Sequence, residues 1–174
     1  MSTITQAAGQ IPQTARDNNT MKAQGALHET SNAAATQRTV AHLDHLNMTV
    51  ADLAESVGWY HRVFGFQTVE SGWYEGHPWA IVKAGEAMLC MYERPRHKRP
   101  DRETYEAQDV HGVSHFALRV DDVAQWRQTL QHENLRTYWD SPVQWPNSTS
   151  WYVRDPSGYE IEVVAWDRNE VTFG

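Results

Sequence analysis

The stretch HLNMTVADLA, from His45 to Ala54, decides the fold because it returns as HFALRVDDVA, from His115 to Ala124. Both copies begin with a histidine, reach a valine at the sixth position and have an aspartate at the eighth. Apolar residues alternate up to the valine, which is typical of a half-buried strand, and the aspartate can cap a following helix. A repeat of this kind indicates two copies of one structural module.

Each copy continues as a helix and three more strands. The first helix carries an apolar stripe and ends at Gly65, and the second stops near Asn134. The predicted elements of the first copy are 43–50, 52–64, 67–73, 79–83 and 87–93, and those of the second are 113–120, 122–134, 136–139, 150–154 and 159–166. Asp155-Pro156-Ser157-Gly158 predicts a turn between the last two strands. The sequence therefore predicts an α+β fold of two βαβββ modules.

The domain boundaries follow from composition. Residues 1–40 hold no Trp, Tyr or Phe, and we expect them to form a disordered tail. The predicted domain covers 41–168, with module one at 41–93, a linker at 94–110, module two at 111–168 and a short tail at 169–174. The basic run Arg94–Pro100 lies in the linker, where its prolines disfavour a helix or a central strand, and we expect it to be solvated.

Composition also excludes several classes of function. The 174 residues hold 15 Lys+Arg and 22 Asp+Glu, and a net charge of −7 argues against a nucleic-acid partner. No run approaches the ~20 apolar residues of a membrane span, and no secretory signal is recognisable. The single cysteine, Cys90, excludes an internal disulfide and a multi-cysteine zinc site. We therefore expect a cytoplasmic protein with no membrane partner.

Three residues stand out on the faces of the predicted strands that point away from the helices. They are His45, His115 and Glu162, and the two histidines occupy the same position of each module. If the two sheets curl into one cup, two imidazoles and one carboxylate converge, which is a donor set for a divalent metal. The alternative for Glu162 is a solvated surface charge. The alternative for any single histidine is a hydrogen-bonded structural residue.

Three segments resemble one known family. They are Leu43–Leu53 with Trp59–Phe66, then Val113–Val120, and finally Trp151–Glu162. Together they resemble the vicinal oxygen chelate proteins, also called the glyoxalase/bleomycin-resistance/dioxygenase superfamily. The resemblance implies a cup-shaped metal site with His45, His115 and Glu162 as ligands of Mn, Fe, Zn or Ni. It also implies a homodimer that shares its sites between chains.

The resemblance implies an enzyme that acts on a small oxygenated substrate by lyase, isomerase, thiol-transferase or ring-cleaving dioxygenase chemistry. Departures from the family patterns leave the reaction open. Glyoxalase I has a glutamate as its fourth ligand, and the equivalent here is Cys90, with Leu89 one register step away and Glu93 a few residues late. The acid–base histidine of extradiol dioxygenases has no counterpart near Ala87–Met88. The phosphonate-binding threonine of fosfomycin-modifying enzymes is Asn47, and their Lys/Ser-rich loop is Pro142–Asn147.

Further roles are assigned as hypotheses. Tyr152 and Glu162 are the candidate catalytic residues, with Tyr152 as a hydrogen-bond donor or general acid. Asn47, Arg119 and Trp151 are the candidate substrate-binding residues. A solvent-exposed role stays open for Arg119, and packing in the core or at an interface stays open for Trp151. We expect Cys90 to be a core residue.

Two other functions compete with the enzyme. One is a small-molecule-binding resistance protein that sequesters an aromatic compound without catalysis. The other is a regulatory module whose N-terminal tail carries the binding motif. Bound metal would favour the enzyme over both.

Overall fold

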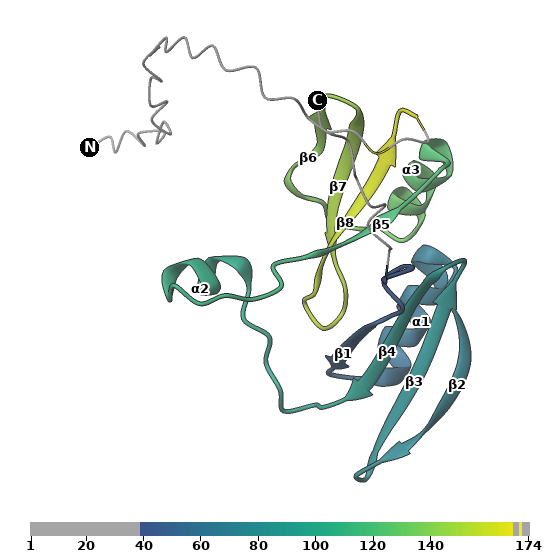
Figure 1. The fold of residues 1–174 in the computed structure, drawn as a ribbon, viewed down its shortest axis with the longest axis vertical. Helices are drawn as coiled ribbons and strands as arrows, with labels where there is room; N and C mark the ends of the chain where they lie inside the picture. The colour runs from purple at the N-terminus through teal and green to yellow at the C-terminus, as the bar shows by residue number, and fades with distance from the viewer. Residues whose placement is uncertain (1–38, 169–170, 172–174) are drawn as a thin grey trace, which may run out of the picture. The chain divides into compact units, whose positions relative to one another are not determined.

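The computed structural model describes residues 39–168 and 171. They form two four-stranded mixed sheets with three helices (Figure 1). The elements in chain order are β1 (Leu46–Val50), α1 (Leu53–Phe64), β2 (Gln67–Tyr74), β3 (His77–Ala84), β4 (Ala87–Glu93), α2 (Arg102–Ala107), β5 (Phe116–Arg119), α3 (Val123–His132), β6 (Tyr138–Trp145), β7 (Ser148–Arg154) and β8 (Glu160–Trp166). The sheet orders are β1-β4-β3-β2 and β5-β8-β7-β6. In each sheet the outer and inner strands β1/β4 and β5/β8 run parallel, and all other neighbours run antiparallel. The predicted α+β fold with two βαβββ modules is confirmed.

The helix ends follow the predicted capping residues. The Asp52 carboxylate accepts a hydrogen bond from the Glu55 N–H at 2.8 Å, and Asp122 accepts one from the Gln125 N–H at 2.9 Å. Each carboxylate thus satisfies a backbone donor that the first helical turn leaves free. Gly65 ends α1 in the left-handed conformation, with φ of 74°. The two helices therefore begin at the equivalent position of each repeat.

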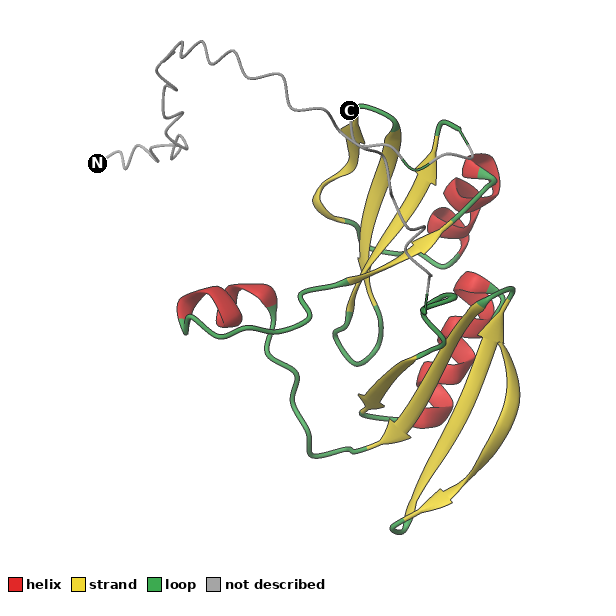
Figure 2. Cartoon of the chain, viewed as in Figure 1, coloured by secondary structure: helices red, strands yellow, loops and turns green. Residues whose placement is uncertain are grey.

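One hydrophobic core joins the two modules. Each sheet turns one face toward its helix (Figure 2). The apolar side chains on that face are buried, as the alternating pattern along β1 and most of β8 shows. The buried members are Met48, Val50, Trp59, Tyr60, Val63, Phe66, Val82, Leu89, Met91, Trp126, Trp151, Val153, Ile161, Val163 and Ala165. The rings of Phe64 from α1 and Trp126 from α3 stack at 5.6 Å with an angle of 10° between their planes. Helix–helix packing thus links the modules.

A buried polar contact adds to this link. The Tyr60 hydroxyl of α1 donates to the Asp155 carboxylate at 3.0 Å, although 95 residues separate them in sequence. Asp155 also accepts from the backbone N–H groups of Ser157 and Tyr159, at 2.9 and 2.8 Å. These bonds hold the predicted turn at 155–158, where the Gly158 N–H closes on the Asp155 carbonyl at 3.0 Å. Burial raises the pKa of both the Tyr60 phenol and the Asp155 carboxyl.

The structure corrects two predicted segments. The strand predicted at 136–139 is β6, which runs on to Trp145 through a cis Ser141–Pro142 peptide. A proline fits there because β6 is the edge strand and its register shifts between Tyr138 and Val143. The linker holds the helix α2, which has no buried residue and therefore no apolar stripe to predict it. Asp101 caps α2 by accepting from the Thr104 N–H at 2.9 Å.

The predicted disordered tail, residues 1–40, lies outside the described residues except for Thr39 and Val40. The described residues from Val40 onward form one compact unit. In the part of the chain that is described, no helix is long and apolar enough to cross a membrane.

Candidate metal-binding and catalytic site

Two of the three predicted metal ligands lie together in module two. His115 directly precedes β5, and Glu162 lies in β8 beside Ala117, two residues after His115 on the same face of the sheet. The His115 Nε2 atom is 3.0 Å from the Glu162 Oε2 atom. The exposed fractions of the two side chains are 29% and 18%, so both reach solvent at an open face of the second sheet.

Strand β7 adds two hydroxyl groups to the same face. Tyr152 pairs with Glu162 across the sheet, and its ring lies edge-on to the His115 ring with centroids 5.7 Å apart. Ser150 donates from Oγ to the Glu162 Oε1 atom at 2.6 Å. Burial, and next the negative charge of Glu162, raise the pKa of the Tyr152 phenol. Tyr152 therefore stays protonated near neutral pH and is available as a donor.

A second carboxylate, Glu160, lies on this face and is almost completely buried, with 3% exposed. Its Oε1 atom accepts from Arg102 of α2 at 2.5 Å, and its Oε2 atom accepts from the Trp139 indole at 2.8 Å. Arg154 lies 3.7 Å from the same carboxylate. The buried charge is thus neutralised by two guanidinium groups, as a buried carboxylate requires.

Arg102 connects this network to the candidate ligand. Its Nη2 atom also lies 3.1 Å from His115 Nδ1, and its guanidinium covers the Trp139 ring at 4.7 Å. Arginine can only donate, so His115 Nδ1 accepts and the ring proton lies on Nε2, facing Glu162. Sequence reasoning missed Arg102, Trp139 and Glu160. Strand alternation could have found Glu160, because it places Glu160 on the same face as Glu162. Arg102 lies in a linker whose path the sequence does not predict.

The third predicted ligand, His45, lies in module one, directly before β1. Its Nδ1 atom is 2.7 Å from the Asp44 carboxylate, and 41% of its side chain is exposed. A carboxylate accepts and does not donate, so Nδ1 carries the ring proton and the Nε2 lone pair is free to bind a ligand. The hydrogen bond with His45 also lowers the pKa of Asp44.

Asn47 and Cys90 lie beside each other on the face of the first sheet that points away from α1. Asn47 is exposed, as a substrate contact requires. Cys90 is buried, as expected for a core residue, and burial followed by the charge of Asp44 raises the pKa of its thiol.

His45 does not join His115 and Glu162 within one chain. Among residues 39–168 and 171, no three His, Cys, Asp or Glu side chains form a group that could hold a metal ion. The half-site of module two and the single histidine of module one are therefore separate in the monomer.

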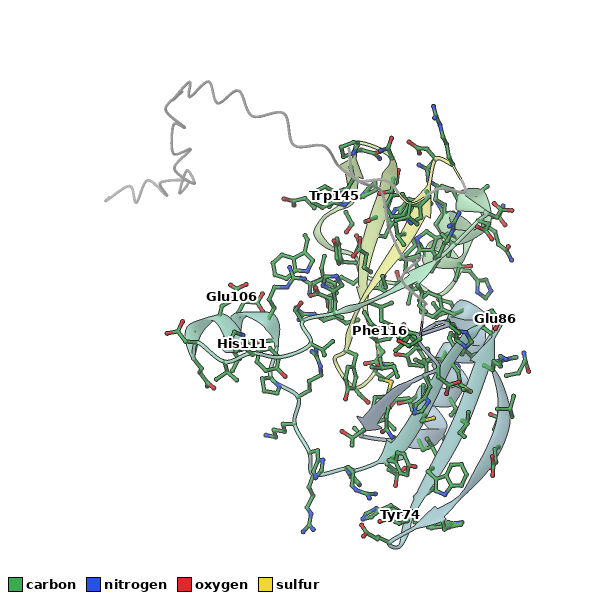
Figure 3. All side chains as sticks on the ribbon, in the orientation of Figure 1. Tyr74, Glu86, Glu106, His111, Phe116 and Trp145 are labelled. Carbon is green, nitrogen blue, oxygen red and sulfur yellow. The ribbon has the colours of Figure 1, made fainter. Side chains whose placement is uncertain are left out.

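Two predicted substrate contacts lie elsewhere. Trp151 is buried in the core with 3% exposed, on the helix-facing side of β7, so the packing alternative holds for it. Arg119 is at the other end of β5, about 13 Å along the strand from His115, and forms an ion pair with Asp121 at 3.4 Å. Trp145 is half exposed at the end of β6, and Figure 3 shows it projecting from that edge.

The donor atoms of the half-site fit a divalent metal. Two atoms that each lie ~2.1 Å from one ion are about 3 Å apart, which is the separation of His115 Nε2 and Glu162 Oε2. An imidazole nitrogen and a carboxylate oxygen suit Mn, Fe, Zn and Ni alike. A metal bound here would displace the ring proton that Nε2 holds toward Glu162, since a histidine ligand is deprotonated at its coordinating nitrogen. With that exchange, the residues present match the group that the sequence predicts.

Known proteins resemble this chain in sequence. A family model described as the Glyoxalase/Bleomycin resistance protein/Dioxygenase superfamily matches residues 42–163. The sequence is 27% identical over 124 residues to the glutathione transferase FosA of Serratia marcescens, covering 70% of this chain and 78% of that protein.

Solved structures share the fold. A glyoxylase/bleomycin resistance protein/dioxygenase domain from Frankia sp. EAN1pec matches with a TM-score of 0.61 at 15% identity, over 76% of this chain and 96% of that one. The fosfomycin resistance protein FosX from Listeria monocytogenes, complexed with Mn(II) and sulfate, matches with a TM-score of 0.52 at 14% identity, over 72% and 93% of the two chains.

Proposed function

Because the chain belongs to the Glyoxalase/Bleomycin resistance protein/Dioxygenase superfamily, we propose that it is a divalent-metal-dependent enzyme acting on a small oxygenated substrate. The observation that carries the proposal is the pair His115–Glu162, whose ligand atoms are 3.0 Å apart beside a protonated Tyr152. The Mn(II) in the FosX structure supports a metal in this fold. The predicted cytoplasmic location is part of the same proposal.

The proposed ligands are His115 and Glu162 of one chain and His45 of a second copy. His45 supports this arrangement because Asp44 holds its Nδ1 atom and leaves Nε2 free, the pattern that carboxylate–histidine pairs show at metal sites. A two-fold dimer would complete two such sites. The metal would supply Lewis acidity toward a substrate oxygen.

The chain's own residues have distinct roles in this proposal. Tyr152 donates a hydrogen bond to the oxygen on which negative charge develops, since its raised pKa keeps the phenol protonated. Ser150 orients the Glu162 carboxylate through the 2.6 Å bond. Asn47 contacts the substrate from the opposing module. Arg119 contacts an anionic group only if the substrate extends along β5.

A substrate panel can discriminate between the candidate reaction classes. FosA supports transfer of a thiol to an oxygenated substrate as the first candidate, whereas Asn47 and the segment Pro142–Asn147 differ from the phosphonate-binding residues of fosfomycin-modifying enzymes. A panel of epoxides with thiols, glutathione hemithioacetals and catechols covers the proposed set, and oxygen consumption identifies ring cleavage.

The test of the shared site is a mixing experiment. His45→Ala and Glu162→Ala homodimers are each expected to lack metal and activity. If chains exchange at random, half of the dimers are mixed, and each mixed dimer has one intact site when ligands come from both chains. Metal content and activity should then recover to about a quarter of the wild-type value. No recovery on proven exchange would contradict a shared site.

A matched control separates ligand loss from general damage. His132 also lies 3.0 Å from a carboxylate, that of Glu133, but it is exposed on α3. His132→Ala should keep one metal ion per chain, whereas His115→Ala should lose it. Equal metal contents in these two variants would contradict the proposed metal-dependent enzyme function.

A second candidate, sequestration of an aromatic compound, has one favourable observation. The Trp79 ring packs on the backbone of Gly72, where an added Cβ atom would lie only 2.9 Å from it. The Trp79 and Tyr92 rings are stacked, with their centroids 6.3 Å apart. This leaves a flat aromatic surface on the face of the first sheet opposite α1. Tight binding of an aromatic compound by metal-free protein, without turnover, would favour sequestration.

A further inference from the structure

Positive charge is concentrated in the linker of a chain whose net charge is −7. Residues 94–100 contain three arginines, one lysine and one histidine and no acidic residue. The structure gathers most of this charge around one hollow of about 370 Å³, where the end of β1 meets the turn between β7 and β8. Its basic wall consists of Arg94, His97, Lys98 and Arg99. No carboxylate side chain lines it.

Arg99 forms the rigid part of this wall. Its guanidinium donates to the carbonyls of Val113 and Ser114 at 2.7 and 3.2 Å, and it covers the Tyr159 ring at 4.7 Å. All of these partners are neutral, so the positive charge of Arg99 is held in place without an ion pair. Lys98 likewise forms no ion pair among the described residues.

Carboxylates beside the hollow already accept hydrogen bonds from other donors, and the Arg99 charge also acts on Asp155. Asp155 accepts from the Tyr60 hydroxyl and from two backbone N–H groups of its own turn. The Glu93 carboxylate accepts from the Leu53 N–H at 2.9 Å. Arg94 forms a long ion pair with Glu75, at 3.6 Å, and donates to the Glu93 carbonyl at 2.8 Å. The hollow therefore keeps an excess of positive charge that an anion would neutralise.

A neutral donor completes the arrangement. The Ser157 Oγ atom accepts from the Ala51 N–H at 3.0 Å, which leaves its own proton free to donate into the hollow. Lysine supplies a compact charge and arginine a planar set of donors, and both are common phosphate ligands. The exposed edge of the Tyr159 ring offers an apolar contact beside them.

We propose that this linker hollow is a binding site for a small organic phosphate, a phosphate monoester. A dianion matches Lys98 and Arg99, two cations without an ion-pair partner among the described residues, and the hollow has room for more than inorganic phosphate alone. The site is separate from the proposed metal centre, and its ligand would contact both modules at once. Binding is therefore expected to stabilise the arrangement of the two modules.

The experiment is calorimetric titration of the full-length protein, freed of metal by a chelator and dialysis so that phosphate cannot bind to a metal ion. The probes are inorganic phosphate, glycerol phosphate and acetate at matched ionic strength. We expect saturable binding of both phosphates, with the monoester at least as tight, and no saturable binding of acetate. Glycerol phosphate should also raise the melting temperature.

Lys98→Gln is the informative variant because Lys98 is exposed and its loss leaves the Arg99 contacts in place. Loss of one charged hydrogen bond should weaken monoester binding about 10-fold. Arg96→Gln is the matched control, since Arg96 belongs to the same basic run but does not line the hollow. It should bind like the wild type.

Three results would overturn the proposal. The first is no saturable phosphate binding at millimolar concentration by correctly folded wild-type protein. The second is an equal loss of binding in the Lys98 and Arg96 variants, which would indicate nonspecific attraction to the basic run. The third is binding of inorganic phosphate without the monoester. Failure of the metal experiments leaves these outcomes unaffected, so the two proposals are tested separately.

Discussion

Replacing Glu160 by glutamine tests whether the buried charge network supports the site. The change preserves the shape of the side chain but removes the charge that neutralises Arg102 and Arg154. Breaking a fully buried ion pair costs about 3–5 kcal/mol. The two guanidinium side chains are 27% and 28% exposed, so water compensates part of their charge. We therefore expect a loss of about 2–3 kcal/mol in the free energy of unfolding.

The assay is equilibrium unfolding in urea, followed by circular dichroism at one fixed protein concentration. With a typical slope of about 2 kcal/mol per molar urea, the midpoint should fall by about 1–1.5 M. The matched control is Glu86→Gln, which changes an exposed glutamate in the β3–β4 turn that has no hydrogen-bond partner in the described structure. It should shift the midpoint little.

The network also reaches the candidate ligand, because Glu160 holds Arg102 and Arg102 contacts His115. Arg102→Gln combined with Glu160→Gln should destabilise less than the sum of the two single changes. Equal unfolding midpoints for the Glu160 and Glu86 variants would refute the reasoning.

Three further predictions concern single side chains. Trp151→Ala should cost about 3–5 kcal/mol in the free energy of unfolding because it empties the core, whereas Trp73→Ala, at a ring 75% exposed, should cost less than about 1 kcal/mol; similar urea midpoints would contradict the core position. Tyr152 has a pKa raised above 10, so its contribution to stability is complete below pH 10 and is lost as the pH rises through the folded-state pKa. The absorbance titration of the wild type minus that of Tyr152→Phe should show one phenol ionising above pH 10, and ionisation below that value would be the contrary result. Cys90 should react slowly with iodoacetamide at neutral pH in the folded protein and fully in urea, because burial raises its pKa; labelling at equal rates would show that the thiol is accessible.

Much of the fold was predictable because its signals are local and repeated. The capping aspartates, the left-handed Gly65 and the turn at 155–158 each depend on a few neighbouring residues. The order of strands then follows from the repeat. Strand β6 was misplaced because its sequence contains Asp140 and Pro142, which read as a break, while an edge strand tolerates both.

The candidate site was only partly predictable. Alternation places His115, Tyr152 and Glu162 on one face, and the structure agrees. The same rule excludes Trp151, because adjacent residues of a strand point to opposite faces and Tyr152 already faces the site. Arg102 was not predictable, since its contact with His115 depends on the path of a linker with no periodic pattern.

The shared core has a consequence for cutting the chain. A fragment that ends after Glu93 would expose Phe64 and Tyr60, and the complementary fragment would expose Trp126 and leave Asp155 without its phenol donor. Neither half is complete alone, yet each carries the surface that fits the other. Cleavage within the basic run should therefore yield two pieces that reassemble when co-expressed, and the protein offers a natural position for a split reporter.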